Sequence, residues 1–69
     1  MKYHSAQKML PSIDALGTLC ALETTSNHQI EGIWAPIPLP DVGPDAYQAS
    51  WLVDGNRFQN KRVSGWAVK

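Results

Sequence analysis

The sequence predicts an α+β fold in which one N-terminal helix packs on a small antiparallel sheet of three or four strands. Apolar residues recur at helical spacing in the first third of the chain. From residue 28 onward they follow the shorter period of β-strands and are interrupted by turn signals. A chain of 69 residues is shorter than most domains, so we expect residues 1–69 to form a single domain.

The predicted helix covers roughly residues 11–22. The residues that place an apolar stripe on one helical face are Met9, Ile13, Leu16 and Cys20. Pro11 suits the first turn of a helix, where its missing N–H would be unpaired in any case. Gly17 lies within the pattern and costs up to about 1 kcal/mol relative to alanine, so the helix needs support from the sheet.

The strand predictions begin after a polar break at residues 23–27. Residues 29–35 contain apolar positions typical of a strand, and residues 47–53 alternate apolar and polar side chains. The returning strand begins at Arg57, and residues 62–69 either continue it or form a short further strand after Asn60-Lys61. Asp54-Gly55 and Gly55-Asn56 are both two-residue hairpin signals. If Asp54-Gly55 is the loop, Trp51 faces Phe58. If Gly55-Asn56 is the loop, Val53 faces Phe58 and Asp54 faces Arg57.

Pro36, Pro38 and Pro40 alternate in a short segment between the first two predicted strands. Each proline removes a backbone donor, so this segment is excluded from the centre of a sheet. Proline-rich segments are also ligands for aromatic grooves, but those grooves recognise prolines three positions apart. The sequence therefore favours an edge strand or a rigid connector here.

Charge and composition exclude several classes of protein. Six basic and six acidic side chains give a formal charge of zero, whereas a dedicated duplex-DNA or RNA binder usually carries a basic excess. The beginning of the chain lacks a secretory pattern, and no segment has the length of a membrane span. A lone cysteine fits a reducing compartment, so we expect a cytoplasmic protein without membrane contact.

The sequence offers no metal, cofactor or catalytic site. His4, His28 and Cys20 are scattered, without the close spacing of metal ligands. Cys20 lies on the apolar face of the predicted helix, where a buried, inert thiol is the usual outcome. We therefore expect a protein that is not an enzyme.

The aromatic residues indicate a binding surface instead. Three tryptophans exceed what so small a core usually holds, and tryptophan is enriched at binding hot spots, so one of them is expected on the surface. We place a protein-binding surface on the predicted hairpin. Its candidate anchors are Trp51, Phe58 and Trp66, and its candidate rim charges are Arg57 and Arg62.

In size, neutral charge and isolated cysteine the chain resembles the small accessory proteins of temperate phages and plasmids, which include repressor antagonists. That resemblance transfers no residue roles. It implies a non-catalytic inhibitor or adaptor that binds another protein, most concretely a phage-type antirepressor that inactivates a DNA-binding repressor. A homo-oligomer that uses a spare apolar face remains open. The alternative is a binder of single-stranded nucleic acid that uses the basic, aromatic segment 57–69.

Overall fold

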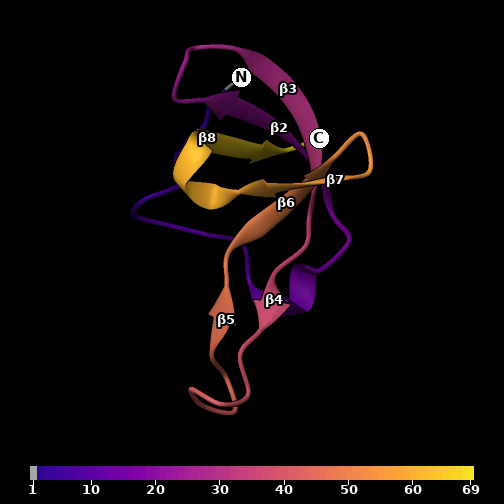
Figure 1. Cartoon of the computed structure of the whole chain (residues 1–69). Coiled ribbons are helices and arrows are strands. Elements are labelled where there is room, and N and C mark those ends of the chain that lie inside the picture. The colour runs from indigo at the N-terminus through magenta and orange to yellow at the C-terminus, as the bar shows by residue number, and fades with distance from the viewer. Residues whose placement is uncertain (1) are drawn as a thin grey trace.

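The computed structural model describes residues 2–69 and consists of β-strands and two single turns of 3-10 helix (Figure 1). Six strands form one antiparallel sheet in the order β1-β8-β2-β3-β6-β7, and two short strands form a separate ribbon. The strands of the main sheet are β1 (His4–Ser5), β2 (Leu19–Thr24), β3 (Gln29–Trp34), β6 (Ser50–Val53), β7 (Asn56–Gln59) and β8 (Val63–Val68). The ribbon contains β4 (Ile37–Pro38) and β5 (Tyr47–Gln48), and the helical turns are η1 (Ile13–Ala15) and η2 (Asn60–Arg62).

The predicted α+β class is wrong, because residues 2–69 contain no α-helix and the sheet has six strands instead of three or four. Ser12 caps the start of a single helical turn. Its Oγ accepts a hydrogen bond from Asp14 N at 3.2 Å, and η1 ends at Ala15. Gly17 then adopts a φ of +92°, which is incompatible with a right-handed helix.

The apolar stripe assigned to the helix is divided between two environments. Met9 and Leu16 are 54% and 64% exposed and therefore do not form a core face. Cys20 and Leu22 are completely buried, because β2 is a central strand whose alternate residues face the core. The spacing of the apolar residues was thus produced by a loop followed by a strand.

The predicted hairpin is confirmed. Asp54 and Gly55 have φ values of 54° and 80°, as a type I′ turn requires, and this turn joins β6 to β7. The register pairs Trp51 with Phe58, which is the first of the two predicted registers. Beyond β7, η2 separates the hairpin from β8, so the C-terminal segment is a further strand that pairs with β2 and β1.

The proline segment forms one side of a projecting arm, residues 35–49, which extends away from the main sheet (Figure 1). Pro38 pairs with Tyr47 in the β4–β5 ribbon, so the prediction of an edge position is confirmed. The base of the arm is fixed by Arg57, whose Nη1 donates to Ala35 O and to Ser50 Oγ, both at 2.8 Å.

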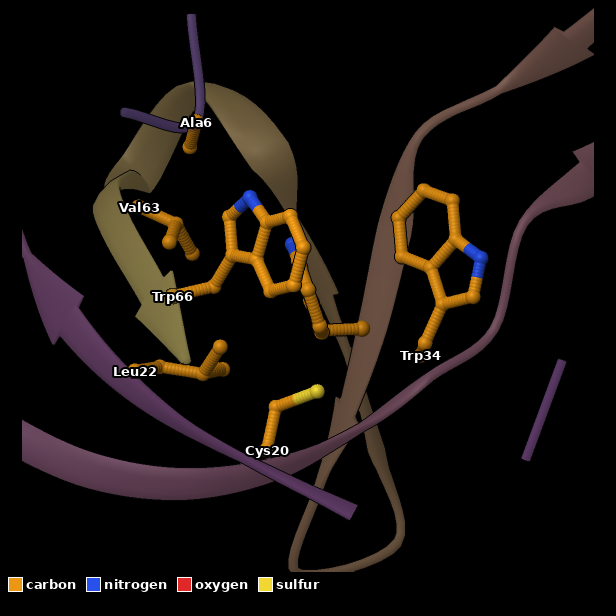
Figure 2. Packing of buried hydrophobic residues seen from close by; sticks show 7 residues of the cluster. Ala6, Cys20, Leu22, Trp34, Val63 and Trp66 are labelled. Atoms are coloured by element: carbon orange, nitrogen blue, oxygen red, sulfur yellow. The ribbon is translucent and has the colours of Figure 1, made fainter. Parts of the chain in front are cut away.

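The core lies on the inner face of the main sheet and is built around three tryptophans. Its buried members are Ala6, Cys20, Leu22, Trp34, Trp51, Val63 and Trp66. Cys20 and Leu22, which both belong to β2, reach toward the indole rings (Figure 2). The ring centroids of Trp34 and Trp51 are 4.8 Å apart, and those of Trp51 and Trp66 are 6.4 Å apart. The aromatic rings therefore form a continuous row through the centre of the molecule.

The sheet curls until its two edges meet at Asn60. This residue directly follows edge strand β7, while Ala6 directly follows edge strand β1. Asn60 Nδ2 donates to Ala6 O at 3.1 Å, and Asn60 Oδ1 accepts from Trp51 Nε1 at 3.0 Å. One side chain thus joins both edges of the sheet to the core.

Candidate functional site

The predicted anchors Trp51 and Trp66 are core residues. They are 0% and 4% exposed, and Trp34 is also 0% exposed, so the expectation of a surface tryptophan is wrong. Each indole N–H is paired as well: Trp34 Nε1 donates to Ser12 O at 3.0 Å and Trp66 Nε1 donates to Met9 O at 2.8 Å. Burial therefore removes these two residues as exposed anchors of a binding surface.

The predicted rim charges Arg57 and Arg62 lie in different places. Arg57 alternates with Phe58 along β7, so its side chain leaves from the outer face of the sheet and binds the base of the arm. Arg62 belongs to η2, and its Cζ lies over the Phe58 ring, 4.5 Å from the centroid. Of the predicted site residues, the structure brings together Phe58 and Arg62.

These two residues line a pocket of about 240 Å³ at one end of the core, which we call the end pocket. Its apolar wall is formed by Ile30, Val53 and Phe58. Its polar rim is formed by Thr24, Thr25, Ser26, His28 and Arg62. Small-molecule sites usually measure about 300–1,000 Å³, so the end pocket has the size to take one or two side chains of a protein partner.

The end pocket forms at the end of the inner sheet face, where the buried core no longer covers the apolar side chains. Ile30 lies on the same face of β3 as Trp34, and Val53 lies on the same face of β6 as Trp51, because side chains alternate along a strand. The tryptophans are buried, whereas Ile30, Val53 and Phe58 are only partly covered. The pocket is thus the uncovered end of the apolar face.

Hydrogen bonds donated by backbone N–H groups hold the rim in shape. Thr24 Oγ1 accepts from His28 N at 3.1 Å and from Ser26 N at 3.3 Å, which orders the turn between β2 and β3. Thr25 N donates to Arg62 O at 3.0 Å and so connects that turn to η2. Because the rim is ordered before any partner arrives, binding there costs little conformational entropy.

Arg62 gives the end pocket its charge. Within residues 2–69 the structure contains one ion pair, between Lys69 and Glu31. No described carboxylate therefore pairs with the Arg62 guanidinium. A cation over an aromatic face, beside aliphatic side chains and hydroxyl groups, matches a ligand that is partly apolar and carries a negative charge.

The residues considered for chemistry remain apart. Cys20 is buried in the core, burial raises the pKa of its thiol, and its Sγ donates weakly to Thr18 O at 3.7 Å. Within residues 2–69 no cluster of histidine, cysteine and acidic side chains has the geometry to hold a metal ion. The described part of the chain also has no helix with the length and apolar character needed to cross a membrane.

The fold and the site define a small antiparallel β protein with a cationic, aromatic pocket at one end of its core. No protein-family model, curated protein or solved structure matches the chain.

Sequence reasoning found Phe58 and Arg62 but missed the other walls of the end pocket. The sequence places Ile30 and Val53 only in predicted strands, and it considers His28 only among the scattered candidate metal ligands. Val53 stands two positions from Trp51 and Ile30 stands four positions from Trp34, in each case on the same strand face, and that even spacing is the available signal. It becomes informative only once the pairing of β3 with β6 is known.

Proposed function

We propose that the protein is a small binding module that docks onto another protein through the end pocket. The partner segment presents an apolar side chain to Ile30, Val53 and Phe58 and a carboxylate to Arg62. The observation that carries this proposal is the Arg62 guanidinium, which lies over Phe58 at 4.5 Å without a described carboxylate partner. An inhibitor of a regulator, such as the phage-type antirepressor, is one form that such a module takes.

A protein partner is favoured over single-stranded nucleic acid by the way the other cations of segment 57–69 are used. Arg57 is held at the base of the arm, and Lys69 pairs with Glu31. A nucleic-acid platform needs a continuous track of free cations along the backbone of the strand. Two of the cations counted for such a track are already engaged within the protein.

The proposal is tested by titrating isotope-labelled protein with a short blocked peptide, Glu-Leu-Gly-Ser-Glu, and with its uncharged counterpart, Gln-Leu-Gly-Ser-Gln. We expect the acidic peptide at millimolar concentration to shift the amide signals of Val53, Phe58 and Arg62, and the uncharged peptide to shift them much less. The Arg62→Gln variant should weaken binding of the acidic peptide about tenfold, because a charge-assisted hydrogen bond is lost.

Lys61→Gln is the matched control, because Lys61 is an exposed residue of η2 outside the end pocket. Equal loss of binding in both variants would indicate a diffuse charge effect and contradict the proposal. A parallel titration with oligothymidylate tests the alternative. Tight binding that falls steeply with salt, without a response to the acidic peptide, would assign the pocket to nucleic acid.

A further inference from the structure

The tip of the arm presents the chemistry that the end pocket is proposed to recognise. Val42 is 76% exposed, the highest value among the exposed large hydrophobic residues. Asp41 and Asp45 stand close to it in the sequence, and both are exposed. An apolar side chain with two nearby carboxylates thus projects into solvent on residues 41–45, which we call the tip.

The tip is ordered by its own backbone. Val42 N donates to Leu39 O at 3.0 Å, Ala46 N donates to Gly43 O at 3.2 Å, and Leu39 N donates to Ala46 O at 2.9 Å. Pro40 and Pro44 restrict the backbone further. A segment that is already shaped loses little entropy when it binds, which raises its affinity for a complementary site.

The tip and the end pocket lie at opposite ends of the same two strands. The arm leaves the end of β3 at Trp34 and returns to the start of β6 at Ser50. The end pocket is formed near the start of β3, by His28 and Ile30, and at the end of β6, by Val53. The arm also extends away from the main sheet (Figure 1), so the tip reaches only the pocket of another molecule.

From this complementarity we infer that the protein associates with itself head to tail, the tip of one copy docking into the end pocket of the next. Val42 packs against Phe58 and its apolar neighbours, and a tip carboxylate pairs with Arg62. Such a contact is heterologous, so it extends into chains or closes into rings. A formal net charge of zero means that overall repulsion between copies does not oppose it. This inference rests on the proposed function and names a partner for the same pocket.

Two variants of the full chain test it by sedimentation velocity over a range of concentrations. Arg62→Glu blocks the pocket and leaves the tip intact. The double variant Val42→Ser with Asp45→Asn blocks the tip and leaves the pocket intact. We expect the wild-type protein to grow in mass with concentration, and each variant to need at least tenfold higher concentration for the same growth.

Mixing the two variants gives the sharper result. An intact tip from the first variant meets an intact pocket from the second, and neither molecule can then extend the chain. The equimolar mixture should therefore form a complex of two molecules and stop at that size. Circular dichroism of each variant checks that the fold is kept, which we expect because the three changed side chains are exposed.

Val68→Ser is a control for a general effect of exposed apolar residues, because Val68 is 59% exposed and lies outside both surfaces. Wild-type protein that stays monomeric at millimolar concentration would overturn the inference, as would association that both variants retain. If the acidic peptide still shifts the pocket signals in that case, the proposed function stands and only the self-association fails.

Discussion

At the residue scale, the three buried tryptophans differ in the group that accepts a hydrogen bond from each indole N–H. A buried indole that lacks an acceptor loses the free energy of its hydration. Ser12 O and Met9 O serve Trp34 and Trp66, whereas Trp51 donates to the side chain of Asn60. The sequence does not predict which acceptor each indole N–H uses, because a backbone carbonyl or a side chain serves equally well.

We expect Asn60→Ala to lower the free energy of unfolding by about 2 kcal/mol, because it leaves the Trp51 N–H unpaired and removes the bond to Ala6 O. In a domain of this size that change lowers Tm on the order of 10 °C. Urea denaturation followed by tryptophan fluorescence measures the loss.

Gln59→Ala is the matched control, since Gln59 precedes Asn60, is exposed and makes no side-chain capping bond. Its unfolding free energy should stay within about 0.5 kcal/mol of wild type. If both variants lost the same amount of stability, the bridging role of Asn60 would be excluded.

At the scale of elements, the β6–β7 hairpin depends on one two-residue turn. Gly55→Ala should destabilise the protein by about 1 kcal/mol, because alanine at a φ of 80° pays a steric cost that glycine does not. No atom outside residues 54–56 lies within 4 Å of the added Cβ, so the cost is conformational and not a clash with the rest of the fold. Chemical denaturation gives the difference in unfolding free energy.

Gly43→Ala provides the comparison, because the added Cβ meets only Ala46 Cβ at 4.0 Å and the residue has no positive φ. That change should be neutral or slightly stabilising, through loss of entropy in the unfolded chain. A Gly55→Ala variant as stable as Gly43→Ala would show that the hairpin tolerates another turn.

The contrast between hairpin and predicted helix shows which elements the sequence specifies. Asp54-Gly55 determines its turn locally, so the hairpin and the pairing of Trp51 with Phe58 were predictable. Strand β2 is different, because in addition to its hairpin with the next strand, β3, it pairs with β8, which lies far away in the chain. Local spacing suggested a helix there, and the non-local pairing overrides it.

The candidate site likewise contains residues that the sequence predicts correctly and residues that it places wrongly. Phe58 and Arg62 were predictable as an aromatic residue and a cation near the hairpin, and the structure places them together. Trp51 and Trp66 were assigned to the same surface, but the curl of the sheet buries both of them. Whether an aromatic residue lies inside or outside depends on closure of the sheet, which no local pattern records.

At the scale of the whole molecule, the N-terminal segment closes the structure. Strand β1 pairs with β8, Ala6 is 2% exposed within the core, and Ala6 N donates to Ser64 O at 3.1 Å. His4 lies against Trp66, with ring centroids 4.6 Å apart. Chain ends are usually dispensable. Here residues 4–6 seal the open edge of the sheet.

We therefore expect a variant that begins at Met9 to be largely unfolded at 25 °C. It loses β1, the buried Ala6 and the carbonyl that accepts from Asn60. A domain of this size has roughly 5 kcal/mol of total stability, and these losses are of that order.

The matched variant replaces residues 39–46 of the arm with Asn-Gly and removes a comparable length of chain. Because this part of the arm lies outside the core cluster, that variant should keep dispersed amide signals and near-ultraviolet circular dichroism. Retention of both signals by the N-terminal truncation would mean that the curled sheet closes without its first strand.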